Sequence, residues 1–322
     1  MPADRDRGEQ ARHRLGFSIR AFGAPDLPSY DGRSPAASGH LSVNLAYLRD
    51  IALYLAANGI GLYRMHSGVL PRALHEDPGE LARQIGECRA QLDQLAGLIA
   101  SLGLRLSFHP YSLVLNALDE EQAERSIRSL TAHAALLDAL GLGPEAVAVL
   151  HVGGVYDDAA TARERFARRY EALPEAVRRR VALEQDDRRF GFADVRRIHA
   201  ACGAPLVFDY LHHRVWNPEG IELHEALAIS LESWPAGVRP KVHFCSARSE
   251  MRRLEGSQRL KAPSWNEHAD YVVPWEFADW LRGAQHLRPF DIMLEAKARD
   301  MALLQLRRDL ARHAPDLAGR VW

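Results

Sequence analysis

Short apolar runs of β-type residues alternate with longer amphipathic stretches along the chain. Glycine follows several of these stretches, as at Gly59 and Gly103, where a helix C-terminus favours a left-handed residue. The runs that we predict as strands are residues 15–19, 60–64, 104–108, 146–151, 181–184, 205–209, 240–244 and 290–295. The stretches that we predict as helices are residues 41–58, 79–102, 120–140, 159–179, 193–201, 222–231, 274–282 and 298–313.

Eight strands and eight helices in strict alternation predict a parallel sheet covered by helices, an α/β architecture. Eight such units favour a single-domain (β/α)8 TIM barrel over an open doubly wound sheet, and no GxGxxG follows the first strand. We expect the barrel to occupy residues 15–322, and residues 1–14 to be a disordered, arginine-rich segment. Residues 23–39 and 246–272 predict long loops after strands one and seven, on the face where barrels carry their chemistry.

The composition is that of an ordinary soluble protein, with 47% hydrophobic and 26% charged residues. The three cysteines, Cys88, Cys202 and Cys245, are far apart and odd in number, which disfavours a disulfide framework and fits a reducing cytoplasm. We find no apolar signal-peptide core at the start and no apolar run of membrane-spanning length. The formal net charge of −1 neither demands nor excludes a nucleic-acid partner. We therefore expect a cytoplasmic monomer that binds no membrane.

The strongest chemical signal is a set of imidazole, acidic and basic side chains at the ends of seven consecutive strands, from the second to the eighth. These residues are His66, His109, His151, Glu184, Asp209, His212, His213, Lys241, His243 and Glu295. Histidine and carboxylate together suit divalent metals, and several acids meeting at one rim would repel one another without cations. The set is larger than one ion needs, which favours two or three ions, the usual means of activating water against a phosphodiester.

An isolated histidine is more often a packing or surface residue than a ligand, and the histidines on predicted helices fit that interpretation. His109, His151 and His243 differ because each ends an apolar strand at the same edge, and Glu184 and Glu295 end strands where an unpaired acid would be unfavourable. The pattern leaves three points open. They are which ring of the His212-His213 pair faces inward, whether loop residue His268 takes part, and whether Lys241 is carbamylated or pairs with a carboxylate.

Side chains that would suit a nucleic acid also follow the strands. Tyr111 and Tyr156 would stack on bases, although aromatic residues in such positions equally often pack against the protein. A basic group in the loop after strand seven would hold backbone phosphates. Its members are Arg248, Arg252, Arg253, Arg259 and Lys261.

These residues lie in blocks that resemble the UV-damage endonuclease family over nearly the whole chain. The blocks read LYRMH at 62–66, LSFHP at 106–110, VLHVGGVY at 149–156, LEQDD at 183–187, FDYLHH at 208–213, PKVH at 240–243, NEHA at 266–269 and MLEAK at 293–297. The resemblance implies a TIM barrel with divalent metals, commonly Mn2+ and alternatively Zn2+ or Mg2+. It also implies hydrolysis of double-stranded DNA on the 5′ side of a UV photoproduct, the first step of an excision repair route.

By matching position, the resemblance also implies a ligand set and a catalytic centre. The implied metal ligands are His66, His109, His151, Glu184, Asp209, His212, His243, His268 and Glu295. Lys241 matches a modified lysine of the family, and we assign it to the catalytic centre with Glu184 and Glu295.

The chain departs from the family where damage is read. The family typically has HPGQY after strand three, whereas this chain has His109-Pro110-Tyr111-Ser112-Leu113, and strand one lacks the family's Tyr and Asn. We therefore weigh a DNA endonuclease against a xylose-isomerase-like metalloenzyme that acts on a sugar or small metabolite. A barrel that only binds DNA is a third alternative, and the full set of ligands argues against it.

Overall fold

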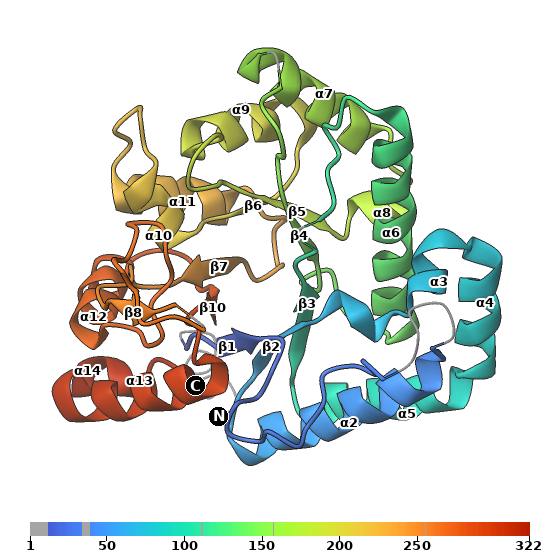
Figure 1. The fold of residues 1–322 in the computed structure, drawn as a ribbon, viewed down its shortest axis with the longest axis horizontal. Helices are drawn as coiled ribbons and strands as arrows, with labels where there is room; N and C mark the ends of the chain where they lie inside the picture. Colours follow the sequence, from blue (N-terminus) through green and yellow to red (C-terminus); the bar gives the residue numbers. More distant parts are fainter. Residues whose placement is uncertain (1–11, 34–38, 111, 157, 255) are drawn as a thin grey trace, which may run out of the picture.

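Eight parallel strands form the centre of the computed structural model, which describes residues 12–322 except 34–38, 111, 157 and 255. Helices surround these strands, as Figure 1 shows. The strands are β1 (Leu15–Ser18), β2 (Leu62–Met65), β3 (Arg105–Phe108), β4 (Ala148–His151), β5 (Val181–Glu184), β6 (Leu206–Val207), β7 (Lys241–Phe244) and β10 (Asp291–Leu294). Their order is β6-β5-β4-β3-β2-β1-β10-β7.

The barrel closes between β6 and β7 through one parallel bridge, which pairs Asp209 with His243. The amide of His243 donates a hydrogen bond of 2.8 Å to the carbonyl of Phe208 at this seam. The predicted TIM-barrel fold is therefore confirmed. Because all eight strands are parallel, their carboxyl ends share one rim, and most of the residues that we predicted at strand ends lie there. Lys241 is an exception, because it begins β7 and does not end it.

Most helices are longer than the strands and mostly follow the predicted ranges. They are α2 (Leu41–Ala57), α3 (Arg72–Glu76), α4 (Pro78–Glu87), α5 (Arg89–Ser101), α6 (Glu120–Ala139), α7 (Ala159–Glu171), α8 (Glu175–Arg178), α9 (Phe192–Cys202), α10 (Tyr210–Val215), α11 (Leu223–Glu232), α12 (Pro274–Gly283), α13 (Arg299–His313) and α14 (Pro315–Ala318), with one 3-10 turn, η1 (Ser67–Val69). None of the helices in the described ranges is long and apolar enough to cross a membrane.

Two predicted helices are each broken in the structure. The predicted helix at 79–102 is two helices that meet at Cys88, whose ψ of 8° ends α4. The predicted helix at 159–179 is also two, because Pro174 lacks an amide hydrogen and starts α8 as its N-cap. The three short helices α3, α10 and α14 were not predicted, since one or two turns give too little periodicity to detect.

The core lies both inside the barrel and between the barrel and its helices. Most strands are buried along their whole length, and buried residues of α6 such as Leu130 and Leu137 pack against them. The chain enters the barrel through His13, which is buried and pairs with Val321, so that the two ends of the described chain lie side by side (Figure 1). The predicted loop at 246–272 contains a small hairpin, formed by β8 (Arg252–Arg253) and β9 (Leu260–Lys261).

Candidate metal centre

Glu184 lies at the centre of the rim, where it ends β5 and has no exposed surface. Its two carboxylate oxygens lie 2.9 Å from His109 Nε2 and 2.9 Å from His243 Nδ1. Two further rings are close, with His212 Nδ1 at 3.4 Å and His151 Nε2 at 3.7 Å. One carboxylate thus faces four imidazoles, which come from β4, β7, α10 and the residue that follows β3.

Two more acids complete the cluster around the same nitrogen of His243, Nδ1. Glu295 Oε1 lies 3.3 Å and Asp209 Oδ2 3.9 Å from His243 Nδ1. Asp209 is fixed because it caps α10, accepting a hydrogen bond of 2.8 Å from the amide of His212. Glu295 pairs with Arg64 and lies 3.8 Å from His268 Nδ1.

The described residues form three groups whose ligand atoms are close enough to share an ion. The groups are His109 with Glu184 and His243, Glu184 with Asp209 and His212, and Asp209 with His243 and Glu295. Each of Glu184, Asp209 and His243 belongs to two groups. Bridging residues of this kind suit a cluster of ions better than isolated sites.

The unsatisfied polar atoms of this cluster also fit divalent cations. Asp209 Oδ2 and His243 Nε2 are buried and have no hydrogen-bond partner within the described part of the chain. Buried polar atoms without partners are strongly unfavourable, and the exceptions in native proteins commonly mark a missing ion. The oxygen and imidazole donors match the preferences of manganese, zinc and similar metals.

The acids of the cluster differ in pKa, and the causes are electrostatic. Burial would raise the pKa of Glu184, but the rings of His243, His151 and His109 outweigh burial and hold it well below its usual value. Burial raises the pKa of Asp209, and the nearby charges of Glu184 and Glu295 raise it further. Acids this close therefore favour a bound cation, which would stabilise both in the charged form.

The structure brings together eight of the nine predicted metal ligands and resolves two points that the sequence left open. The eight are His109, His151, Glu184, Asp209, His212, His243, His268 and Glu295. His212 faces Glu184, whereas His213 Nε2 is 2.9 Å from the carbonyl of Ile221 and its ring packs on Phe208. His268 also reaches the rim, which its place in a loop did not reveal.

His66 is the exception among the predicted ligands. It belongs to none of the three groups and, unlike His151 and His268, it pairs with none of the described acids of the cluster. Its Nδ1 accepts a hydrogen bond of 2.8 Å from the amide of Gly68. The ring is stacked on Tyr30, with centroids 4.3 Å apart. Burial, with a smaller effect from Arg20, lowers the pKa of His66.

The comparisons with known proteins agree with this geometry. Residues 38–317 match the family model described as UV-endonuclease UvdE. The chain belongs to this family. It is 33% identical to a UV DNA damage endonuclease of Bacillus velezensis over 298 residues, which are 90% of this chain and 88% of the relative. The predicted resemblance is therefore confirmed, and the chain is a homologue of DNA repair endonucleases.

Solved structures show the same relationship. The crystal structure of SacUVDE superposes with a TM-score of 0.78 at 25% identity, covering 93% of this chain and 98% of that one. A 3-keto-D-glucoside 4-epimerase of E. coli superposes at 0.53 with 14% identity, over 94% of this chain and 100% of that one, which shows a shared fold alone. The barrel fold by itself therefore does not distinguish a DNA substrate from a sugar substrate.

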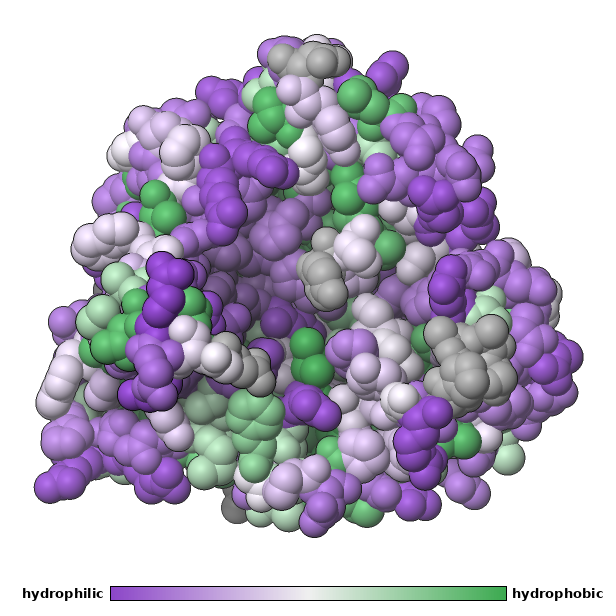
Figure 2. Space-filling model, in the orientation of Figure 1, coloured by the Kyte–Doolittle hydropathy of each residue, from purple (hydrophilic) through white to green (hydrophobic). Residues whose placement is uncertain are grey.

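The mouth of the barrel in this family member is hollow and polar. Figure 2 shows a depression near the centre of this face, lined mainly by hydrophilic residues. Of the predicted DNA-binding residues, Arg252 and Arg253 are exposed on β8, whereas Arg248 pairs with Asp270 and Lys261 with Glu267. Tyr156 is 42% exposed and Arg259 is exposed as well, while Tyr111 lies outside the described residues.

Sequence reasoning missed Arg64, which pairs with Glu295 from inside β2. The signal that could have marked it is a charged residue in an otherwise apolar strand. Trp265 was missed too; it is 85% exposed beside the basic loop. No periodic pattern covers that loop, so the sequence did not indicate which of its side chains face solvent.

Proposed function

We propose that this chain is a metal-dependent endonuclease that nicks double-stranded DNA on the 5′ side of UV photoproducts or related lesions. The observation that carries the proposal is the cluster around Glu184, in which each of Glu184, Asp209 and His243 belongs to two of the three groups of ligand atoms. Membership of the UV-endonuclease UvdE family supports DNA as the substrate. Further parts of the proposal are that the chain acts as a monomer and in the cytoplasm, where its three free cysteines would stay reduced.

The cluster would hold two or three divalent ions, of which we propose Mn2+ first and Zn2+ or Mg2+ as alternatives. The residues that hold them are the eight that meet at the rim. When bound, such ions supply an activated water and neutralise charge on the leaving oxygen of a phosphodiester. Lys241, buried on β7 with its Nζ unpartnered, stays in the proposed catalytic centre with Glu184 and Glu295.

The residues of the chain itself position the reacting groups. Glu184 orients the rings of His109 and His243, and Arg64 neutralises Glu295 at Oε1, the oxygen that also faces His243. Exposed Arg252 and Arg253 lie on the same face and would hold backbone phosphates, together with Arg259 and the partly paired Arg248 and Lys261. A small sugar has no need of these outer cations, which favours the DNA proposal over the metabolite alternative.

The decisive experiment is cleavage of UV-irradiated duplex DNA by the purified protein with Mn2+. We expect a nick on the 5′ side of the lesion, with no cleavage of undamaged duplex and none after chelation. Glu184→Ala and Glu295→Ala should abolish the nick. Intact irradiated DNA in the presence of manganese-loaded protein would contradict the proposal, and turnover of a sugar under those conditions would favour the metabolite alternative.

A further inference from the structure

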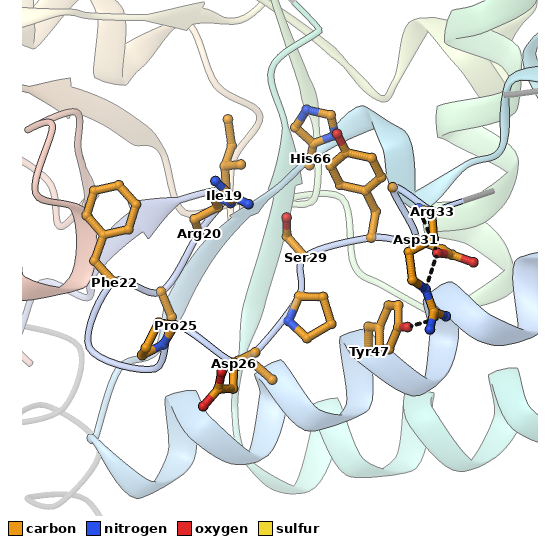
Figure 3. A pocket seen from close by; sticks show the side chains of 15 residues that line it. Ile19, Arg20, Phe22, Pro25, Asp26, Ser29, Asp31, Arg33, Tyr47 and His66 are labelled. Atoms are coloured by element: carbon orange, nitrogen blue, oxygen red, sulfur yellow. Dashed lines mark hydrogen bonds and ion pairs between the residues drawn. The ribbon is translucent and has the colours of Figure 1, made fainter. Parts of the chain in front are cut away.

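A second feature of the barrel mouth lies beside the metal centre and takes no part in it. The first βα loop encloses a cavity of about 830 Å3, which falls within the roughly 300–1,000 Å3 of small-ligand pockets. Figure 3 shows Phe22 and Arg33 at opposite ends of this cavity, with His66 between them. His66 therefore lines this cavity, and its contacts show which role it can have there.

The hydrogen bond that His66 accepts disfavours metal binding through Nε2. Its Nδ1 accepts from the Gly68 amide, so the hydrogen of the neutral ring is on Nε2. A histidine that binds metal through Nε2 needs the opposite arrangement, in which Nδ1 donates to a carbonyl or carboxylate. His212 shows this ligand arrangement, because its Nδ1 lies 3.0 Å from the carbonyl of Gln185. No described carboxylate pairs with His66, whereas Glu184 faces four imidazoles.

The position of the His66 ring is fixed from several sides. Tyr30 stacks on it with an interplanar angle of 6°. Gly68 has to be glycine here, because a Cβ at that position would lie 2.8 Å from both the His66 Nδ1 and the Tyr30 ring. The buried side chain of Asn44 connects the loop after β1 to the turn after β2. It accepts a hydrogen bond from the Asp31 amide at 2.7 Å and donates one to the Val69 carbonyl at 2.9 Å. His66 is thus held rigidly before any ligand arrives.

The backbone that opens the cavity is also unusual. Ile19 follows β1 with a φ of 72°, a conformation that a β-branched residue rarely adopts. It is fixed there because its amide donates to the Arg64 carbonyl at 2.8 Å and its carbonyl accepts from the Tyr63 hydroxyl at 2.6 Å. Strained residues that are held in this way cluster at ligand sites, and Ile19 lines this cavity.

We propose that His66 binds the substrate and not a metal, donating from Nε2 to an oxygen of a nucleotide that enters this cavity. The cavity offers the groups that a displaced nucleotide needs: Phe22, 51% exposed, and Tyr30 for a base, and Arg20 for a phosphate. The proposal rests on the proposed function. It also gives the chain a means of holding a damaged nucleotide in place of the Gln-Tyr pair that it lacks after β3.

The test compares His66→Phe with His109→Phe, which removes a residue of the metal cluster. Manganese per chain is measured after dialysis, and the KM and kcat of nicking are measured on irradiated duplex. We expect His66→Phe to keep the native manganese content and to raise KM about 10-fold or more, as loss of a hydrogen bond to a charged acceptor does. His109→Phe should lose manganese. His66→Gln retains an N–H donor and should recover part of the KM.

Tyr30→Leu provides a second variant, which removes the stacked ring but retains the His66 side chain and its hydrogen bond from Gly68. It should also raise KM at native manganese content. Loss of manganese from His66→Phe, or an unchanged KM in both His66→Phe and Tyr30→Leu, would overturn the proposal. If the native protein fails to nick irradiated DNA, the proposed function fails. Manganese content and the Kd for an irradiated oligonucleotide then still decide whether His66 is a ligand of metal or of nucleic acid.

Discussion

Glu184 is the residue on which the metal centre most depends, because it faces four imidazoles and belongs to two of the three ligand groups. Its burial makes the effect of a charge change large, since water cannot take the place of an ionic partner at a fully buried position. At the scale of residues, metal binding therefore depends on single side chains such as Glu184.

The first prediction concerns the charge of this residue. Glu184→Gln keeps the shape of the side chain but removes its negative charge, so we expect manganese affinity to fall by more than the roughly 10–100-fold that loss of an outer-shell partner costs. Isothermal titration with Mn2+ measures the change. Glu76→Gln is the matched control, because Glu76 pairs only with Arg72 on the surface. Native affinity in Glu184→Gln would contradict the assignment.

His13 carries a prediction about pH. Burial lowers its pKa from 6.5 to about 4, while its Nδ1 lies 2.8 Å from the carbonyl of Phe290. Between these two values the unfolded chain binds more protons than the folded one, so the stabilisation is complete above pH 6.5 and is lost as the pH falls towards 4. At about 1.4 kcal/mol per pKa unit, the loss is about 3 kcal/mol.

Urea denaturation of the native chain and of His13→Phe at pH 7 and pH 4 measures this loss. The variant keeps an aromatic ring against Phe290 but cannot titrate, so its free energy of unfolding should fall by about 3 kcal/mol less than that of the native chain. Equal losses in the two proteins would show that His13 does not contribute to acid sensitivity.

At the scale of elements, the hairpin of β8 and β9 is an addition to the barrel that projects basic residues on the catalytic face. Arg252 and Arg253 are exposed, and their neighbours Met251 and Leu260 are each 58% exposed. An exposed strand pair with cations and apolar side chains is typical of a surface that contacts another molecule. The hairpin therefore belongs to DNA binding in the proposed function, and the metal centre does not depend on it.

The prediction for this element concerns salt. Replacing Arg252 and Arg253 by alanine should reduce the slope of log affinity against log salt concentration by about 0.9 for each DNA phosphate that is no longer neutralised. Fluorescence anisotropy with an irradiated duplex at several salt concentrations measures the slope, and manganese content should stay native. Arg282→Ala serves as the control, because Arg282 lies at the end of α12, outside the hairpin, and pairs with Asp316 of α14. An unchanged slope would remove these arginines from the DNA surface.

At the scale of the whole molecule, the two ends of the barrel have opposite electrostatic character. The carboxyl ends of the strands carry the acids and imidazoles of the metal centre. The amino ends carry Asp291, fully buried and bound by Arg14 at 3.1 Å, Arg105 at 3.0 Å and Arg239 at 2.9 Å. In TIM barrels the first end carries out the chemistry and the second contributes stability.

This division predicts that a change at the amino ends affects stability alone. Asp291→Asn leaves three arginines without their shared counter-ion, which should lower the free energy of unfolding by about 3–5 kcal/mol. Chemical denaturation measures this loss, with the surface change Asp316→Asn as the control. The folded fraction should keep native manganese content and KM. Loss of manganese from folded Asp291→Asn would show that the two ends are coupled.

The sequence by itself determined the fold and most of the metal centre. Alternating periodicities define the eight βα units, and a residue at the end of a parallel strand is necessarily at the rim. Glu184, His109 and His243 could therefore be placed from strand position alone. The short helices and the break at Cys88 could not, because one or two turns bury too few residues to leave a periodic signal.

Only the tertiary structure decided what lies in loops and which way each ring turns. His268 reaches Glu295 because a long loop folds back over the rim. His212 and His213 are neighbours in α10, and the helix directs the first ring to Glu184 and the second to the carbonyl of Ile221. His66 follows a strand as His109 does, yet the Gly68 amide and the Tyr30 ring turn it towards a different cavity. Sequence position fixes where a backbone atom is, whereas side-chain direction depends on contacts between segments that are distant along the chain.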